Sequence, residues 1–496
     1  MGGARVRWLR RGTAGVLLLM LFALVGCGSE PPNVVGSDLE RASASIRAAG
    51  FTVGAVAYSD SPGTTWTVIA QSPSGRLESG RSIDLRLVGP RPVEAPGVVG
   101  VSRQDAASAL IATGLELGVV GEAHDTSAPA STVLSQSVRA GQQTPVGTSV
   151  DVTVSLGAEP PASSSARLRR VKRTTGAFSP KSVVASQNGF VFAQNMMYRH
   201  TISVFSDTTY KLVKTLRDTV TLADYGYKEY ATPVRGAPVE AAMSADGRYV
   251  YVSNYSMFGA GFSHPGDDVG SPGSGVDRSF VYRIPVATLK VDKVIKVGAV
   301  PKYLAATPDG RYLLVSNWIS YTVSIVDTKT NRQVRTIKVG AYPRGIAITS
   351  DSRWAYVAVM GSTSIAKIDL DTFHLDWLRG VGSSPRHVVL SPDDRFLYVT
   401  LNGSGRIAKI RTSTGKVIAR AATGSQPRSM AIAEDGLSLY VVNYASNTVS
   451  KVRTRDMHVL QTLPTDTHPI GITYVNKSRE VWVSCYRGSV LVFRDR

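Results

Sequence analysis

Five basic side chains in the last two-thirds of the chain directly follow a proline, and four of these pairs recur every 42 residues. The five cations are Lys181, Lys302, Arg344, Arg386 and Arg428. Equivalent residues of a repeated unit occupy equivalent points of a fold, so these cations are expected to converge. Together they would hold a carboxylate or a phosphate by charge-assisted hydrogen bonds. The alternative is that duplicated units inherited a basic residue that has no role in binding.

Two histidines are the candidates for acid–base catalysis. His387 directly follows Arg386, and His264 lies in a glycine-rich segment. An imidazole suits proton transfer because its ordinary pKa lies near neutrality, but a lone histidine is more often a structural hydrogen-bond donor. The seven histidines show no spacing typical of a metal site, and no nucleophile elbow has a strand-to-helix setting. We therefore expect no metal and no cofactor, and we assign no catalytic residue firmly.

The composition excludes several classes of protein. The chain has 496 residues, of which 43% are apolar, and this is enough for several packed domains. Two cysteines cannot form a disulfide framework, and only residues 15–25 are apolar enough to enter a bilayer. Residues 31–165 carry 8 basic and 12 acidic side chains, whereas residues 166–496 carry 44 basic and 24 acidic ones. This surplus of positive charge predicts an anionic partner for the second segment.

The N-terminus is typical of an exported protein. Four arginines precede a short apolar stretch at residues 16–25, and residues 24–27 read Leu-Val-Gly-Cys. These four residues resemble the lipobox of bacterial lipoproteins. The resemblance implies that residues 1–26 are a signal peptide and that Cys27 is diacylated, which would anchor the protein at the outer face of the cell membrane. An ordinary signal peptide or a single anchor helix is the alternative. Cys485 would then be the one cysteine left, and we expect it in the core.

Residues 31–157 contain no lysine and repeat one pattern at a spacing of about 65 residues. Each unit has a Pro-x-Val-Val-Gly segment, a short helix, a Gln-Ser pair and an alternating strand. The helices are expected at residues 37–49, between Ser37 as cap and Gly50 as stop, and at residues 102–113. This order resembles the PASTA domain of bacterial cell-wall kinases and penicillin-binding proteins, with domains at 31–90 and 91–157. The resemblance implies peptidoglycan as a partner, and the alternative is a pair of spacers.

The remaining residues form a repeat. Four short strands are expected in each unit of 42 residues, and this is typical of a propeller blade. The clearest markers of the repeat are Pro301, Pro343, Pro385, Pro427 and Pro469. Two less regular units begin near Pro180 and Pro238, which gives seven. Residues 170–176 resemble residues 335–340 and would supply the strand that the last unit lacks. After a linker at 158–166, residues 167–496 therefore predict a closed, all-β, seven-bladed propeller behind two small α+β domains.

The repeats resemble the YVTN family of propellers through the strand motifs Tyr-Val-Ser-Asn at 251–254 and Tyr-Val-Val-Asn at 440–443. In such a ring the segment that enters each innermost strand rims the central channel. The five cations would then form a positive funnel, interrupted by Val239 and Ile470 in the other two blades. Insertions at 219–235 and 255–277 are expected on the same face, and the second is either a mobile lid or an unstructured surface loop.

These observations predict a lipid-anchored cell-envelope binding protein whose PASTA-like domains contact peptidoglycan and whose propeller binds an anionic ligand or an anionic envelope polymer. Nucleic acid is not expected as a partner, because an exported protein does not meet it. The alternative, which the resemblance to other propellers implies, is a lactonase-like hydrolase or lyase. It would act at the channel mouth, with His264 and His387 as its acid–base pair.

Overall fold

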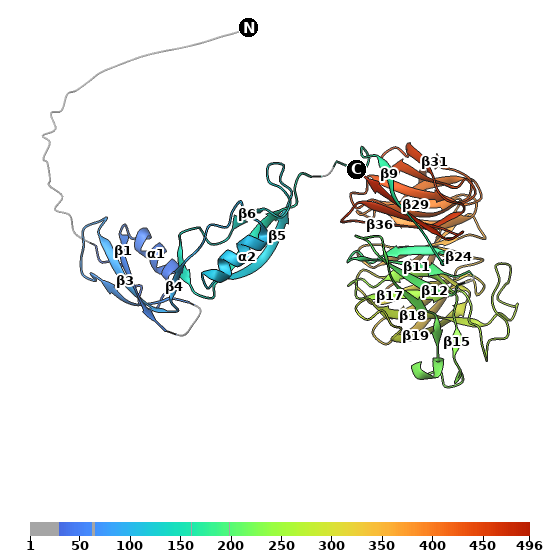
Figure 1. The fold of residues 1–496 in the computed structure, drawn as a ribbon, viewed down its shortest axis with the longest axis horizontal. Helices are drawn as coiled ribbons and strands as arrows, with labels where there is room; N and C mark the ends of the chain where they lie inside the picture. The colour runs from blue at the N-terminus through green and yellow to red at the C-terminus, as the bar shows by residue number, and fades with distance from the viewer. Residues whose placement is uncertain (1–28, 62–64, 160, 198) are drawn as a thin grey trace, which may run out of the picture. The chain divides into compact units, whose positions relative to one another are not determined.

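The computed structural model describes residues 29–61, 65–159, 161–197 and 199–496 (Figure 1). The chain divides into two compact units, Met1–Glu159 and Pro160–Arg496. Within the described ranges, no helix combines the length and the apolar character that a membrane span requires. The predicted signal peptide and Cys27 lie outside the described residues.

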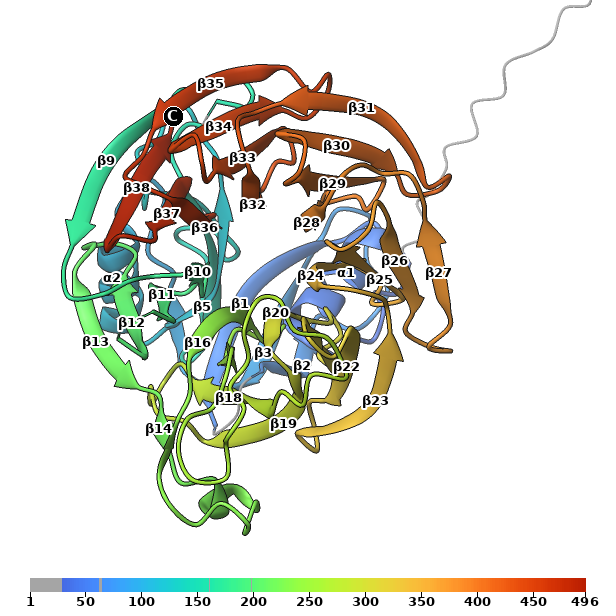
Figure 2. The same ribbon diagram turned by 90° about the vertical axis from the view of Figure 1, so that its right-hand side faces the viewer.

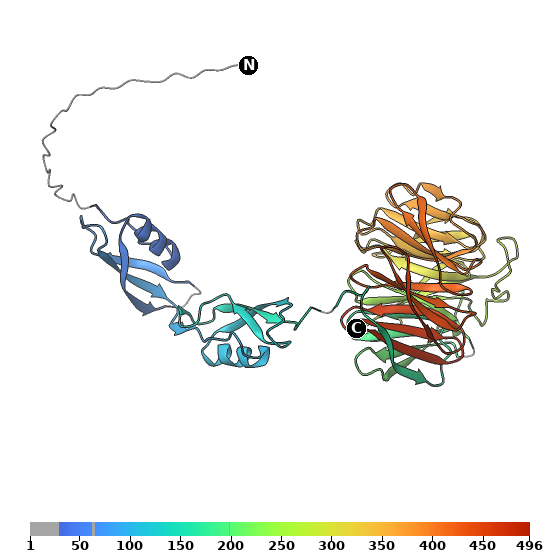
Figure 3. The same cartoon turned by 90° about the horizontal axis from the view of Figure 1, so that it is seen from above.

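The first unit contains two modules, each with one helix and a three-stranded sheet. In the first module, α1 (Leu39–Ala48) precedes β1 (Thr52–Asp60), β2 (Thr67–Ser72) and β3 (Ser82–Gly89). The sheet order is β1-β3-β2, with β1 parallel and β2 antiparallel to β3. The second module repeats this arrangement with α2 (Arg103–Ala112), β5 (Glu116–Ala123), β6 (Val133–Gln136) and β8 (Ser149–Ser155), and it adds a small sheet of β4 (Pro92–Glu94) and β7 (Gln143–Pro145). Each helix covers one face of its own sheet (Figure 3).

The helix boundaries confirm the sequence prediction in part. Ser102 caps α2, where its side chain accepts a hydrogen bond from the backbone of Asp105. The prediction that Ser37 caps the first helix is wrong, because Asp38 holds that position and accepts from the backbone of Arg41 at 2.8 Å. Both residue types satisfy a free helix N–H, so two adjacent candidates left the position ambiguous.

A glutamine explains why the two modules share their sequence pattern. In the first module, the side-chain oxygen of Gln71 accepts from the backbone of Val34 at 2.7 Å, and its nitrogen donates to the carbonyl of Pro32 at 2.9 Å. Gln136 makes the same two bonds, to Val98 at 2.7 Å and to Pro96 at 3.0 Å. The repeated Pro-x-Val-Val-Gly segment is therefore tied to the second strand of its sheet.

Seven four-stranded antiparallel sheets form a ring in the part of the second unit that the structure describes (Figure 2). This confirms the seven-bladed propeller. The innermost strands are β10 (Ser182–Ala185), β16 (Pro238–Met243), β20 (Pro301–Ala306), β24 (Pro343–Ile348), β28 (Pro385–Leu390), β32 (Pro427–Ile432) and β36 (Pro469–Val475). The second strands are β11 (Phe190–Asn195), β17 (Tyr249–Asn254), β21 (Tyr312–Asn317), β25 (Trp354–Val359), β29 (Phe396–Leu401), β33 (Ser438–Asn443) and β37 (Glu480–Cys485).

The two outer layers complete the blades. The third strands are β12 (Thr201–Ser206), β18 (Arg278–Pro285), β22 (Thr322–Asp327), β26 (Ile365–Asp369), β30 (Arg406–Arg411), β34 (Thr448–Arg453) and β38 (Ser489–Asp495). The outermost strands are β13 (Leu212–Arg217), β19 (Lys293–Ala299), β23 (Arg332–Lys338), β27 (Leu375–Leu378), β31 (Lys416–Ala422), β35 (Val459–Pro464) and β9 (Leu168–Thr175). Apolar side chains of neighbouring blades pack between the sheets, and Cys485 is buried in one of these clusters, as predicted.

The ring is closed by the predicted strand from the N-terminal side. In the last blade, β9 pairs antiparallel with the C-terminal strand β38, from Ser489 opposite Thr175 to Asp495 opposite Leu168 (Figure 2). A buried ion pair lies at one end of this ladder. The ammonium group of Lys451 donates to Asp495 at 2.5 Å and to the carbonyl of Ala166 at 2.8 Å, and Tyr440 donates to the same carboxylate.

We predict that Asp495→Asn destabilises the propeller by about 3–5 kcal/mol, because Lys451 is then buried without a counter-charge. Denaturant unfolding followed by tryptophan fluorescence measures this change. The matched control is Asp456→Asn, which breaks the exposed pair with Arg453 and should leave unfolding almost unchanged. Equal unfolding midpoints for the two variants would contradict a role of the buried pair in closure.

Candidate functional site: a cation cluster in the central channel

An irregularity in the innermost strands directs the cations into the channel. In β20 the register passes from Pro301 opposite Asn317 to Leu304 opposite Val315, so the inner strand contains one extra residue. The same shift occurs in β24, β28 and β32. A β-bulge re-aims the side chains at the extra residue. In these four blades the re-aimed positions include the residue after the proline, and this residue is the predicted cation.

The backbone just before each proline fixes where the inner strand begins. Tyr342 and Gln426 have φ angles of 62° and 53°, and Val300, Ser384 and His468 share this left-handed conformation. The carbonyl of Gln426 accepts from the backbone of Tyr444 at 3.0 Å, and equivalent bonds recur around the ring. Such φ values cost on the order of 1–3 kcal/mol for residues other than glycine, so the surrounding ring must impose them. Four of the cations, Lys302, Arg344, Arg386 and Arg428, therefore lie at the same level of successive blades.

The structure brings the five predicted residues together as one cation cluster, defined here as Lys181, Lys302, Arg344, Arg386 and Arg428. Four of them are at most 6% exposed, and Arg428 is half-buried. Burial, and then the neighbouring Arg344 and Arg428, lower the pKa of Arg386 well below its ordinary value. Burial and Arg344 likewise lower the pKa of Lys302 to about 7. Val239 and Ile470 interrupt the cluster, as the sequence indicates.

Two carboxylates oppose the five cations. Glu240, on β16, lies 3.3 Å from the ammonium group of Lys181. Asp268, on the insertion at 255–277, lies 2.8 Å from the ammonium group of Lys302 and also accepts from the hydroxyl of Tyr255 at 3.2 Å. Burial alone would raise the pKa of Asp268, but Lys302 outweighs it and the pKa falls to about 2. With all seven groups ionised, positive charge remains in excess.

Aromatic rings contact several of the cations and hold them in place without neutralising their charge. The guanidinium of Arg428 lies 3.5 Å from the ring centre of Tyr444, and the ammonium of Lys302 lies 4.2 Å from that of Tyr255. Arg344 lies 5.6 Å from the ring centre of Trp318. The three aromatic residues occupy the same position, directly after the second strand of their blades. Ring faces attract cations but leave their N–H donors free for an anion.

Some nitrogens in and beside the cluster lack a hydrogen-bond partner among the described residues. The Nε groups of Arg386 and Arg428 are buried and make no hydrogen bond, and the same is true of Nδ1 of His387. Buried polar groups are normally satisfied, so these three nitrogens require an explanation. An anion that accepts from these guanidinium groups would provide it.

The two predicted catalytic histidines lie in different surroundings. His387 is buried in the channel, where its Nε2 lies 3.0 Å from the hydroxyl of Tyr303, and burial and Arg386 lower its pKa to about 3. His264 is exposed on the insertion and contacts Ser263. Among the described residues no interaction joins the two imidazoles, and no three His, Cys, Asp or Glu side chains gather as metal ligands would.

Both insertions are held by the propeller. Residues 219–235 form a hairpin of β14 (Thr219–Val220) and β15 (Val234–Arg235) around a short 3-10 helix, Leu222–Tyr225. The second insertion, at 255–277, is attached through Asp268, whose backbone carbonyl also accepts from the indole of Trp318 at 3.1 Å. It is therefore an ordered loop that reaches the cation cluster, rather than the unstructured surface loop that the sequence left as an alternative.

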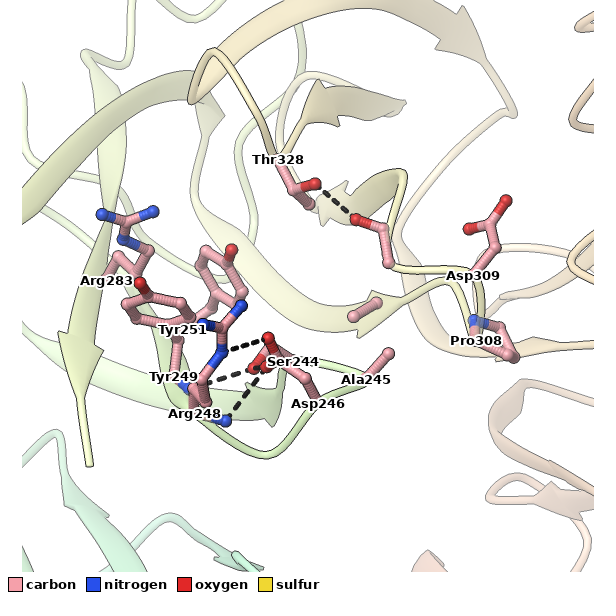
Figure 4. Close-up of a pocket in the computed structure, with 12 residues that line it drawn as sticks. Ser244, Ala245, Asp246, Arg248, Tyr249, Tyr251, Arg283, Pro308, Asp309 and Thr328 are labelled. Atoms are coloured by element: carbon pink, nitrogen blue, oxygen red, sulfur yellow. Dashed lines mark hydrogen bonds and ion pairs between the residues drawn. The ribbon is translucent and has the colours of Figure 1, made fainter. Parts of the chain in front are cut away.

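A pocket outside the channel lies between blades two and three, near the turns that join the first strand of each blade to its second strand (Figure 4). It has a volume of about 590 Å³, with Arg283, Tyr249 and Tyr251 on one wall and Pro308 and Asp309 on the other. Its charged groups already have partners: Arg283 pairs with Asp292 at 2.7 Å and Arg248 with Asp246 at 2.6 Å. The cation cluster therefore remains the stronger candidate for a binding site.

Sequence reasoning missed both carboxylates as members of the site and the aromatic positions beside the cations. A signal for the aromatic residues was present, because Tyr444 and Tyr486 stand 42 residues apart and Trp318 belongs to the same series. Asp268 carried no such signal, because its segment has no counterpart in the other blades.

Comparisons with known proteins agree with this architecture. Residues 29–89 and 93–156 match the PASTA domain, and residues 333–493 match the YNCE-like beta-propeller. The chain carries two PASTA domains and a β-propeller. The finer assignment of the propeller to the YVTN family stays a prediction.

Two curated proteins show related sequence. The chain is 33% identical over 154 residues to a probable serine/threonine-protein kinase PknB of Corynebacterium glutamicum, covering 30% of this chain and 24% of the kinase. It is 29% identical over 150 residues to the probable serine/threonine-protein kinase CPE1738 of Clostridium perfringens, covering 30% of this chain and 22% of that protein. The chain thus spans about a quarter of the length of these relatives.

One solved structure supports the fold of the larger unit. A chain of Kuenenia stuttgartiensis Hydrazine Synthase superposes with a TM-score of 0.52 at 19% identity, covering 65% of this chain and 97% of that one. At this identity the likeness concerns the fold alone.

We predict that Arg386→Met raises the free energy of unfolding by roughly 1 kcal/mol, because it replaces a buried charge beside two like charges with an apolar side chain. Denaturant unfolding measures the change. The control is Lys338→Met, on the exposed outermost strand β23, which should not stabilise the propeller. A lower stability of Arg386→Met than of the wild type would show that Arg386 serves the fold rather than a ligand.

Proposed function

We propose that the protein is a lipid-anchored binding protein of the cell envelope and that its propeller holds an anionic ligand in the central channel. The observation that carries this proposal is the grouping of four buried cations with the half-buried Arg428, where Glu240 and Asp268 supply the counter-charges among the described residues. Grouping buried like charges lowers the free energy of unfolding of the propeller. A bound anion would offset this cost, which gives the arrangement a function.

The PASTA domains extend the proposal to the cell wall. The two PASTA domains, which the structure describes at residues 29–61 and 65–159, belong to a compact unit distinct from the propeller. The resemblance to PASTA domains supports peptidoglycan as its partner. The lipobox-like residues 24–27 support an anchor at Cys27, on the outer face of the cell membrane. The protein would then bind its anionic ligand close to the wall.

The central prediction concerns anion binding by the cation cluster. Inorganic phosphate should raise the melting temperature of the wild type more than chloride does at equal ionic strength. The triple variant Arg344→Gln, Arg386→Gln, Arg428→Gln should bind phosphate at least tenfold more weakly, because each charged hydrogen bond contributes about 1.5–3 kcal/mol.

Its control is the triple variant Lys296→Gln, Lys338→Gln, Arg420→Gln on the outermost strands β19, β23 and β31, which should keep the phosphate effect. Sulfate, whose charge does not change between pH 6 and pH 9, should bind more tightly at pH 6. The reason is that the pKa of Lys302 is about 7, so its ammonium form is lost as the pH rises. Equal losses in the two triple variants would contradict the proposed site.

A separate prediction concerns the anchor. Cys27→Ser removes the thiol that acylation requires, so the protein should leave the membrane fraction or remain unprocessed. Cell fractionation with mass spectrometry of the N-terminus measures both. Unchanged membrane retention of a correctly cleaved Cys27→Ser product would refute the lipid anchor.

A further inference from the structure

A cavity of about 280 Å³ lies between the innermost strands of the ring. Ser182, Tyr303, His387 and Ser429 line it, and each of them follows a cation in the sequence. Glu240, the partner of Lys181, is a fifth lining residue. None of the five cations lines the cavity itself, but Glu240 joins one end of it to the cation cluster through its contact with Lys181 at 3.3 Å.

The other end of the cavity lies at the opposite face of the ring. Gln187 and Asn476 line the cavity there, in the turns that follow the innermost strands β10 and β36. A hydrogen bond joins the two turns, because the backbone of Asn476 donates to the side-chain oxygen of Gln187 at 3.0 Å. A small molecule can thus be placed between the cations and this face without displacing Asp268 from Lys302.

The lining of the cavity is suited to hydroxyl groups. His387 and Tyr303 both line the cavity, and Nε2 of His387 lies 3.0 Å from the hydroxyl of Tyr303. Because burial lowers the pKa of His387 to about 3, its imidazole is neutral and offers a donor or an acceptor rather than a charge. Glu240 adds a carboxylate, which accepts hydrogen bonds from hydroxyl groups and repels a second anion.

The volume limits the size of the occupant. Pockets for small molecules span roughly 300–1,000 Å³, and a cavity of about 280 Å³ stands at the lower end of this range. It would accommodate a body of the size of a monosaccharide and would exclude a folded polymer. The occupant must also place its single anionic group at the cation end.

We propose that the propeller binds a small polyhydroxylated anion, a sugar acid or a sugar phosphate, with its anionic group on the cation cluster and its hydroxylated body in the cavity beside His387 and Glu240. This inference rests on the proposed function, and it adds the chemical class of the ligand. A carboxylate and a phosphate would share one mode of binding, because both accept charged hydrogen bonds from cations such as those of the cluster.

Isothermal titration of the full chain with four probes tests the inference. The probes are glucuronate, glucose 6-phosphate, inorganic phosphate and glucose. We expect at least one of the two sugar anions to bind tenfold or more tightly than phosphate, and glucose to bind weakly because it lacks the charge. The comparison of glucuronate with glucose 6-phosphate distinguishes a carboxylate from a phosphate as the anionic group.

The variant Ser429→Leu narrows the cavity from β32 and should remove the advantage of the sugar anion while phosphate still binds. Its control is Thr336→Leu, at an exposed position of β23, which should bind as the wild type does. The wild-type titrations decide the matter even if Ser429→Leu fails to fold. Phosphate binding as tight as that of both sugar anions would overturn this inference and leave the proposed function intact. Binding of neither phosphate nor a sugar anion would overturn both.

Discussion

The pairing of β9 with β38 is the constraint on which the rest of the propeller depends. A channel exists only in a closed ring, and here the last blade takes three strands from the C-terminal end and one from the N-terminal side. The buried contact of Lys451 with Asp495 and with the carbonyl of Ala166 ties both ends of the domain into this blade. An open ring would let the innermost strands separate, and cations that repel one another would move apart first.

Closure is what makes the cation cluster possible, because each of its members would avoid the others in a flexible chain. The propeller holds them with ring faces, as between Arg428 and Tyr444, and with two carboxylates, Glu240 and Asp268. Aromatic rings keep the charge available, whereas a full set of carboxylates would neutralise it. The site thus carries a cost in stability that a bound anion would offset, a relation between function and stability that is common at binding sites.

The spacing of the prolines predicted the blades and the convergence of the five cations, because a repeat fixes equivalent positions in space, and the resemblance of residues 170–176 to residues 335–340 predicted the closing strand. Neither pattern predicted what surrounds the cations. The bulge after Pro301 depends on pairing with β21, and the contact of Asp268 with Lys302 depends on the path of an insertion that no other blade contains. The choice of Asp38 over Ser37 as helix cap rests on one residue of register, which local preference does not decide.

The route by which the chain enters the propeller has a mechanical consequence. Residues just before β9 are fastened to the two last blades: both the backbone and the hydroxyl of Ser163 donate to Asp435, at 2.7 and 2.6 Å, and Arg479 donates to the carbonyl of Pro161 at 2.6 Å. A pull applied through the N-terminal part of the chain would therefore load these bonds before it reached the ladder of β9. The hydrogen bonds of Pro161 and Ser163 would bear the force in place of β9, so the ring would stay closed when the chain before it is stretched.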